Sequence, residues 1–272
     1  MSGTLYLVAT PIGNLEDITV RAARILREAD VIACEDTRQS RKLLDHLGIS
    51  KPLVSYHEHN EAARTAELIE RLTAGETVAI ISDAGTPLIS DPGYRLVIAA
   101  IAAAIPVVPL PGPNAAVAAL SASGLPTDAF RFCGFLPPKS TARRKIFESL
   151  RSEDCTLIFY ETPHRILEAL EDLEAVLGPR PVVVARELTK VYEEFLRGAA
   201  SEVRTALAAR PSVKGEITLL IGKGSAVEVS TTTPEEAVRE LEQQGVPRMD
   251  AIKQVAKARG LHKRDLYRSI IS

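Results

Sequence analysis

Charged side chains directly follow two of the short apolar runs, at positions where polar sites gather in α/β proteins. Asp36 and Arg38 follow one run, and Glu187 and Lys190 follow another. A carboxylate in such a place could remove a proton, while a cation could hold a phosphate or lower the pKa of a hydroxyl. Each acid could equally form a structural ion pair, and Asp36 could cap a helix.

The segment Ile80–Gly93 is longer than a connection between two elements requires, and loops of this kind usually place function. Its glycines, Gly85 and Gly93, would let the backbone approach a ligand closely. Asp83 and Asp91 could bind hydroxyl groups or a cation. The alternative for Asp91 is a turn or helix cap, since a proline and a predicted helix follow it.

The turn within Leu7–Thr19 joins a predicted strand to a helix, and its backbone N–H groups could bind an anion or a polar cofactor. It lacks the G-x-G-x-x-G pattern, so a purely structural turn is the alternative. The chain has no G-x-S-x-G, H-E-x-x-H or G-x-x-x-x-G-K-[ST] motif, which disfavours serine hydrolases, zinc proteases and P-loop ATPases. His57, His59 and His164 lack the spacing of metal ligands, so no metal site is expected.

Basic and acidic residues are distributed unevenly along the chain, which the net charge does not show. The 272 residues are 46% hydrophobic and 25% charged, which provides material for a sizeable core. The net charge of −2 by itself argues against a nucleic-acid partner. However, residues 246–272 hold seven Lys and Arg against two Asp and Glu, and residues 136–151 hold five against one. Two basic segments therefore accompany a mildly acidic body.

The cysteines and the hydropathy indicate the compartment. Three cysteines stand in apolar sequence without a C-x-x-C pair, which predicts buried thiols and excludes a disulfide scaffold. No secretory signal is visible at the N-terminus. The longest uncharged stretch, Leu96–Leu110, is shorter than the roughly 20 apolar residues of a spanning helix and contains two prolines. We therefore expect a cytoplasmic protein without membrane segments.

Apolar runs of strand type alternate with amphipathic helical patterns, which predicts an α/β protein with largely parallel sheets. The predicted strands are Leu5–Ala9, Val31–Cys34, Leu53–Tyr56, Thr77–Ser82, Ile105–Leu110, Thr156–Tyr160, Val182–Arg186 and Ile217–Ile221. The predicted helices between them are Asp17–Ala29, Asn60–Ala74, Tyr94–Ala104, Ala142–Leu150, Pro163–Leu177 and Ala199–Ala209.

Two breaks divide this pattern into three parts. The proline-rich Pro109–Pro113 indicates a hinge or cleft between two α/β domains, residues 1–112 and 113–229. A polar run then precedes a segment that is helical throughout, residues 230–272, whose first helix is capped by Thr233. This small all-helical segment has an apolar inner face that includes Ile252 and Leu266.

Several segments together resemble the tetrapyrrole-methylase superfamily of S-adenosylmethionine enzymes, in the order expected along the chain. They are Thr10–Thr19, Ser82–Gly93, Leu110–Asn114, Tyr160–Arg165 and Glu187–Lys190. The resemblance implies two α/β domains with a cofactor cleft between them, and a homodimer. Within the superfamily it is to members that methylate ribosomal RNA, which implies 2′-O-methylation of a cytidine ribose in the decoding centre of 16S rRNA, in the 30S subunit.

The same resemblance implies which residues hold S-adenosylmethionine. They are Pro11, Asp83, Gly85, Thr86, Leu88, Ile89, Pro111, Asn114, Ala115, Phe159, Tyr160, Ala185 and Glu216. Many related methylases carry Gly-Asp-Pro where this chain has Thr86 in the middle position, so an acidic role there would pass to Asp83. A ribose hydroxyl is a poor nucleophile until it loses its proton, and the candidate bases are Asp36, Glu187 and Asp83.

Basic residues would provide the RNA contacts, since phosphate contacts supply affinity and shape supplies selectivity. The candidates are Arg38, Arg143, Arg144, Lys145, Arg186, Lys190, Arg248, Lys253, Lys257, Lys263 and Arg264. For any single one of them, a solvated helix surface is the alternative.

Two other functions remain open on the sequence. A methylase of the same superfamily acting on a small tetrapyrrole or a protein side chain would not need the basic tail. A non-catalytic RNA-binding protein of ribosome assembly would not need a cofactor pocket.

Overall fold

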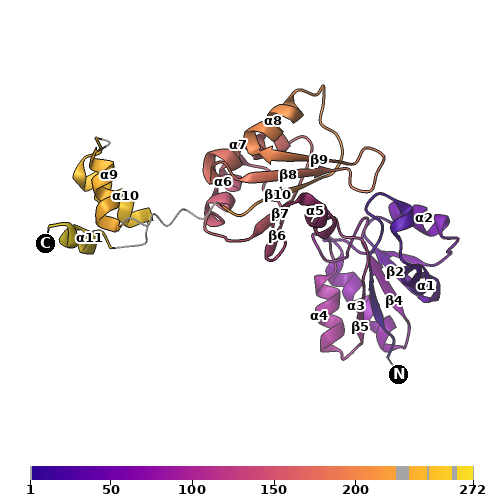
Figure 1. The fold of residues 1–272 in the computed structure, drawn as a ribbon. Coiled ribbons are helices and arrows are strands. Elements are labelled where there is room, and N and C mark those ends of the chain that lie inside the picture. The colour runs from indigo at the N-terminus through magenta and orange to yellow at the C-terminus, as the bar shows by residue number, and fades with distance from the viewer. Residues whose placement is uncertain (1, 225–232, 244, 259–261, 272) are drawn as a thin grey trace. The chain divides into compact units, whose positions relative to one another are not determined.

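A computed structural model describes residues 2–224, 233–243, 245–258 and 262–271, without the side chains of residues 257, 258, 265 and 271. The chain divides into two compact units, residues 1–223 and 224–272. The first unit contains two five-stranded sheets with helices on both faces, and the second contains helices (Figure 1). No helix in the described ranges is long and apolar enough to cross a membrane.

The first sheet is parallel throughout and has the strand order β3–β2–β4–β1–β5. Its strands are β1 (Leu5–Val8), β2 (Val31–Cys34), β3 (Leu53–Ser55), β4 (Val78–Ile81) and β5 (Val107–Leu110). The helices that accompany it are the 3-10 turn η1 (Leu15–Asp17), α1 (Val20–Glu28), α2 (Thr37–His46), α3 (Glu61–Thr73) and α4 (Tyr94–Ala102).

Alternating side chains of the first sheet enter two different cores, which explains why its strands are apolar at consecutive positions. In β2, Ile32 and Cys34 pack with helix α1, whereas Val31 and Ala33 pack with helices α3 and α4. Both faces of β2 and β4 are therefore buried. The strand runs predicted from the sequence are confirmed here, with ends that differ by at most two residues.

The second sheet is mixed and has the order β6–β7–β10–β8–β9. Its strands are β6 (Phe130–Phe135), β7 (Thr156–Glu161), β8 (Pro181–Arg186), β9 (Glu194–Ala199) and β10 (Ile217–Ile221). Helix α5 (Ala115–Ser123) covers one face, and helices α6 (Ser140–Ser149), α7 (Ile166–Leu177) and α8 (Ala200–Ala208) cover the other. Only β6 and β7 are parallel neighbours, so the prediction of largely parallel sheets is wrong for this sheet.

Besides the 3-10 turn η1, four elements of the first unit were not among the predicted strands and helices. Helix α5 is apolar on all sides, so it has no helical period, and α2 follows the charged Asp36 that caps it. Strand β6 is interrupted by an irregularity, and β9 is only partly buried. Each sheet draws its strands from one of the ranges 1–112 and 113–229, while the division of these ranges into separate domains stays a prediction.

The second unit consists of α9 (Pro234–Gln243), α10 (Arg248–Ala258) and α11 (Lys263–Ile271). Its own small core includes Val238, Ile252 and Leu266. The predicted cap at Thr233 is confirmed: its hydroxyl accepts from the backbone N–H of Glu236 (3.2 Å), whose carboxylate accepts from the backbone N–H of Thr233 (2.6 Å).

Candidate active site

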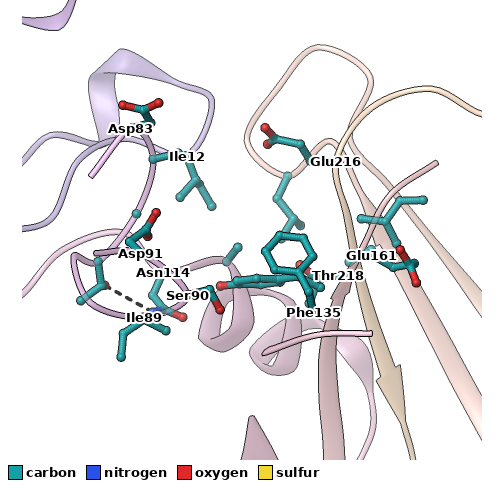
Figure 2. A pocket seen from close by; sticks show the side chains of 18 residues that line it. Ile12, Asp83, Ile89, Ser90, Asp91, Asn114, Phe135, Glu161, Glu216 and Thr218 are labelled. Atoms are coloured by element: carbon teal, nitrogen blue, oxygen red, sulfur yellow. Dashed lines mark hydrogen bonds between the residues drawn. The ribbon is translucent and has the colours of Figure 1, made fainter. Parts of the chain in front are cut away.

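A cavity of about 270 Å³ opens between the two sheets of the first unit, close to the lower end of the ~300–1,000 Å³ range of small-molecule sites. One wall comes from the loops that follow β1 and β4, and the opposite wall comes from β7, β8 and β10 (Figure 2). Asp83 and Asp91 stand on the first wall, and Phe135 and Glu216 stand on the second. This position, at the carboxyl ends of strands, is where ligands bind in open α/β sheets.

The first wall is fixed by hydrogen bonds between two loops. The backbone N–H of Thr10 donates to the carbonyl of Gly85 (2.9 Å), and the N–H of Gly85 donates to the carbonyl of Thr10 (3.0 Å). The Thr10 hydroxyl also donates to the carbonyl of Ser82 (3.0 Å). Leu88 and Ser90 have positive φ angles of 71° and 70°, conformations that cost free energy and cluster at functional sites.

The second wall follows from strand register. Strand β10 runs antiparallel to β7 and β8, and Ile217 at its start pairs with Glu161 and Arg186 at their ends. The start of β10 and the ends of β7 and β8 therefore lie side by side at one end of the sheet. This explains why Glu216, which precedes β10, lines the same cavity as Tyr160 and Ala185.

The mouth of the cavity carries an exposed aromatic ring that depends on a β-bulge. Phe132 pairs with Ile158, but Phe135 pairs with Tyr160, so β6 contains one extra residue between these pairs. The extra residue places Phe135, 55% exposed, where Gly134 would otherwise stand. The Phe135 ring lies edge-on to Tyr160, with 5.5 Å between the ring centroids.

The cavity is acidic. No Lys, Arg or His is among the described residues that line it, whereas Asp83, Asp91, Glu161 and Glu216 are. Burial, and then the charges of Glu35 and Asp83, raise the pKa of Asp91 to about 7. The remaining lining is largely small or apolar, so the cavity suits a ligand with a cationic centre and an apolar or planar part.

Most of the predicted cofactor residues line this cavity. They are Asp83, Gly85, Thr86, Ile89, Asn114, Ala115, Tyr160, Ala185 and Glu216. Thr86 and Asn114 also join the loop after β4 to the start of helix α5, since the Asn114 amide donates to the Thr86 hydroxyl (3.3 Å), which in turn donates to the carbonyl of Pro113 (3.1 Å). Pro11, Leu88 and Pro111 are not among the lining residues.

The prediction that the Phe159 side chain contacts the cofactor is wrong. Successive side chains of a strand point to opposite faces, so Phe159 faces the core under α6–α8 while Tyr160 faces the cavity. The Phe159 ring is 1% exposed and packs against Phe147, with 5.9 Å between the centroids. Its side chain therefore does not reach the site.

The candidate bases are placed differently from one another. Asp83 lines the cavity and accepts a hydrogen bond from the backbone N–H of Asp36 (3.1 Å). The Asp36 carboxylate caps α2 and accepts from the Arg38 backbone N–H (2.8 Å) and guanidinium (2.8 and 3.1 Å). These hydrogen bonds lower the pKa of Asp36 to about 2, so the helix-cap interpretation of this residue holds.

Glu187 also lies outside the lining. Its carboxylate accepts from the ammonium of Lys190 (2.9 Å) and from the backbone N–H of Glu216 (3.0 Å), which lower its pKa. Lys190 bonds Glu216 as well (3.1 Å). A Cβ added at Gly13 would lie 2.5 Å from Cγ of Lys190, so the first turn packs directly on this loop.

Two of the predicted RNA contacts are wrong because their side chains are both bonded to other groups and largely buried, with exposures of 0% for Arg143 and 15% for Arg186. Arg143 is 0% exposed and donates to Asp172 on helix α7 (2.9 Å). Arg186 donates to Glu194 (2.5 Å) and to the carbonyls of Lys214 (3.0 Å) and Tyr192 (3.1 Å), which hold the loop after β8. Neither guanidinium is available to a phosphate.

Other predicted cations are exposed. Arg144 is half-exposed, and Arg38 and Lys145 lie on the surface of the first unit. In the second unit, Arg248, Lys253, Lys263 and Arg264 are exposed, whereas the side chain of Lys257 lies outside the described residues. Their exposure permits contact with a polyanion.

Several lining residues were not among those predicted from the sequence: Ile12, Ala84, Ser90, Phe135, Glu161, Leu188, Ile217 and Thr218. Most of them adjoin a predicted residue at the end of a strand, so extending each segment by one or two residues would have found them. Phe135 carried no such signal, because strand β6 was not predicted and its bulge depends on pairing with β7.

The chain is similar to known proteins in both sequence and structure. Residues 4–204 match the model of the family Tetrapyrrole (Corrin/Porphyrin) Methylases. A Halalkalibacterium halodurans protein named Ribosomal RNA small subunit methyltransferase I is 52% identical, with 97% of this chain and 93% of that protein covered. A Haemophilus influenzae protein of the same name is 48% identical, with 98% and 96% covered.

Solved structures show the same fold at lower identity. A diphthine synthase matches with a TM-score of 0.63 and 17% identity, covering 81% of this chain and 90% of that one. Uroporphyrin-III C-methyl transferase from Thermus thermophilus, complexed with S-adenyl homocysteine, matches with a TM-score of 0.55 and 20% identity, covering 81% and 97%.

Proposed function

The chain belongs to the tetrapyrrole (corrin/porphyrin) methylase family, and on this premise we propose that it transfers a methyl group from S-adenosylmethionine to small-subunit ribosomal RNA. The acceptor we propose is the 2′-oxygen of a cytidine ribose in the decoding centre of 16S rRNA, presented in the 30S subunit. The observation that carries the proposal is similarity along nearly the whole chain to proteins named Ribosomal RNA small subunit methyltransferase I.

The cavity fits S-adenosylmethionine by the chemistry of its lining. Bound there, this cofactor supplies a methyl group that the positive charge on sulfur has already activated. Asp83 and Glu216 would balance that charge, while Ile12, Ile89 and Leu188 would line an apolar slot for the adenine. The closed backbone contact between Thr10 and Gly85 holds the first wall in place, so alignment rather than rearrangement would be the main contribution of the protein.

The RNA would be held by an aromatic contact near the site and by cations farther away. An exposed ring beside a cavity offers a stacking surface to an unpaired base, and Phe135 has that exposure. The exposed cations Arg38, Arg144 and Lys145 of the first unit would contact phosphates. The basic residues of the second unit would add further, salt-dependent affinity.

We also propose that the enzyme acts in the cytoplasm as a homodimer. Helix α4 supports the dimer, because Tyr94, Ile98 and Ile101 are 69%, 48% and 63% exposed. A second copy would bury this apolar surface. Sedimentation or light scattering of the full chain would give twice the monomer mass, and a monomer at micromolar concentration would refute the dimer.

The decisive experiment offers labelled S-adenosylmethionine to the full chain with 30S subunits, with naked 16S rRNA as the matched control. Label in the RNA of the subunits, at a linkage that resists alkaline hydrolysis, would support ribose methylation. A chain that binds the cofactor but leaves the RNA unlabelled would contradict the proposal.

A second experiment separates the RNA side from the cofactor side. Deletion of residues 232–272 removes the helices of the second unit and leaves residues 1–231, which include the whole of the compact first unit, residues 1–223. We expect weaker RNA binding with nearly unchanged binding of S-adenosylmethionine. An equal loss of both would show that the tail is structural.

A further inference from the structure

We propose that the loop between strands β8 and β9, residues 187–193, helps to bind an unpaired nucleotide of the RNA next to the methyl acceptor. The base of this nucleotide would stack on Tyr192, and its phosphate would contact Lys214. The inference rests on the proposed function and adds a recognition element outside the cofactor cavity. Neither residue was predicted from the sequence as a site residue.

The tip of the loop exposes two consecutive apolar side chains beside the cavity. Val191 and Tyr192 are 93% and 73% exposed. In the same loop, Leu188 is only 8% exposed and lines the cavity, and the ammonium of Lys190 donates to Glu216 on the cavity wall (3.1 Å). Adjacent exposed apolar side chains mark interaction surfaces, whereas single ones are common on any protein. An RNA strand whose acceptor enters the cavity would pass this tip.

The backbone of the loop is strained and is held by hydrogen bonds. Glu187 and Thr189 have positive φ angles of 53° and 66°, which cost free energy for residues other than glycine. The backbone N–H of Lys190 donates to the carbonyl of Glu187 (3.0 Å), and the N–H of Glu193 donates to the carbonyl of Lys190 (3.1 Å). The Glu193 carboxylate accepts from the backbone N–H of Thr189 (2.6 Å). The fold therefore imposes the conformation that exposes Tyr192.

One guanidinium joins the tip to a second loop. Arg186 donates through Nη2 to the carbonyl of Tyr192 (3.1 Å) and through Nη1 to the carbonyl of Lys214 (3.0 Å). Lys214 lies between α8 and β10 and is exposed. Because both carbonyls meet the same planar group, an aromatic and a cationic residue are neighbours on the surface although 22 positions separate them in the sequence.

The ammonium of Lys214 has no acidic partner among the described residues. The acids of the two loops are bonded to other groups of the protein, and they are Glu187, Glu193 and Glu216. An exposed ring beside an unpaired ammonium matches the two parts of a nucleotide, since a base stacks on aromatic side chains and a phosphate pairs with cations.

The same features disfavour a second copy of the chain as the occupant. The two apolar side chains of the tip are a small surface compared with the roughly 800 Å² that each partner contributes to a stable interface. An apolar protein contact would also remove the Lys214 ammonium from water without pairing it, which costs free energy. RNA supplies the missing negative charge.

The test measures steady-state methylation of 30S subunits with excess labelled S-adenosylmethionine. Tyr192→Ala should raise the KM for subunits at least about fivefold with little change in kcat, because a stacked neighbouring base is bound equally before and during methyl transfer. Tyr192→Trp keeps an aromatic face and should stay within about twofold of the natural KM. The matched control is Phe130→Ala, which removes a ring that is 47% exposed at the opposite end of the second sheet and should leave the KM unchanged.

Salt dependence distinguishes the base contact from the phosphate contact. Lys214→Gln should raise the KM and lower the slope of log KM against log salt concentration by about 0.7, the value for one phosphate of a single strand. Tyr192→Ala should leave this slope unchanged, because stacking on a neutral ring releases no counterion. A natural slope in Lys214→Gln would overturn the assignment of Lys214.

Both variants should bind S-adenosylhomocysteine like the natural protein in calorimetry. A natural KM for subunits in Tyr192→Ala would overturn the inference. A loss of S-adenosylhomocysteine affinity would also overturn it and assign the loop to the cofactor cavity, and dissociation of a dimer in light scattering would assign the tip to a second copy. A natural protein that labels no RNA would instead refute the proposed function.

Discussion

Two regions of the first unit surround a carboxylate with groups of opposite charge. Between helices α6 and α7, Asp172 is 4% exposed and accepts hydrogen bonds from Ser140 (2.8 Å), Arg143 (2.9 Å) and Arg144 (2.6 Å). On the cavity wall, Asp91 has acids for neighbours and no cation. Burial raises the pKa of both groups, but the hydrogen bonds to Asp172 outweigh burial and lower its pKa.

The difference distinguishes an acid that stabilises the folded protein from an acid that destabilises it. When one partner of a buried carboxylate is removed, the remaining charge is buried without compensation, and the protein loses stability. An acid without partners costs stability and persists where a function needs it. The two regions should therefore respond to substitution with opposite signs.

The largest effect is expected at the paired acid. Arg143→Met should lower the free energy of unfolding by about 3 kcal/mol, because it leaves Asp172 buried with its charge incompletely balanced. Urea denaturation measures this. The matched control, Arg144→Met, removes a half-exposed partner of the same carboxylate and should cost less than about 1 kcal/mol. Equal losses would show that burial of the guanidinium is unimportant.

A second paired acid, Glu194, should make the free energy of unfolding depend on pH. Hydrogen bonds from Arg210, and next from Arg186, lower the pKa of Glu194 to about 2 from its ordinary 4.5. The stability from this group is therefore present above pH 4.5 and is lost as the pH falls towards 2. Glu194→Gln should be less stable at pH 7 by about 2 kcal/mol, with the gap shrinking in acid.

Chemical denaturation at pH 7 and pH 3 tests this prediction. The control is Glu28→Gln, which breaks an exposed pair with Arg24 (2.7 Å) and should change stability by less than about 0.5 kcal/mol at either pH. A gap for Glu194→Gln that is the same at both pH values would contradict the assigned pKa.

A cation placed in the cavity would give its acids a positive neighbour, as Asp172 already has between α6 and α7. Ser90→Lys introduces an ammonium among the acids of the lining and should weaken binding of S-adenosylmethionine at least about tenfold, ~1.4 kcal/mol, through repulsion of its positive sulfur. Calorimetry measures the affinity. Ser90→Met has a similar length without the charge, and if it weakens binding equally, then bulk rather than charge is responsible.

The smallest effect is expected at Asp91 and has the reverse sign. Because the pKa of Asp91 is raised from 3.8 to about 7 in the folded protein, its ionised form is penalised there. The destabilisation grows as the pH rises from about 4 to 7 and is then constant. Above pH 7, Asp91→Asn should therefore be more stable than the natural protein by about 1 kcal/mol, or about 2–4 °C in Tm.

Thermal unfolding at pH 5 and pH 8 follows this change. The advantage of Asp91→Asn should be larger at pH 8 than at pH 5. A variant that is less stable than the natural protein at pH 8 would mean that Asp91 supports the fold, and the contrast between the two regions would fail.

The sequence predicted what depends on local pattern. Strands β2 and β4 were recognisable because both of their faces are buried, and the loop Ile80–Gly93 was recognisable by its length and composition. Arg143 was misassigned because its partner Asp172 lies 29 residues away in sequence and meets it only after α6 and α7 pack together. Similarly, the carboxylate that accepts from the backbone N–H of Gly93, at the start of helix α4, belongs to Glu61, which lies 32 positions earlier at the start of helix α3.

The bulge in β6 makes the identity of one wall residue depend on chain length rather than on residue type. If β6 paired regularly with β7, Gly134 would lie opposite Tyr160 and Phe135 would turn towards the helices on the other face. No point substitution exchanges two faces of a strand in this way. A family that varies the number of residues here could therefore change which acceptors it admits while keeping nearly the same composition.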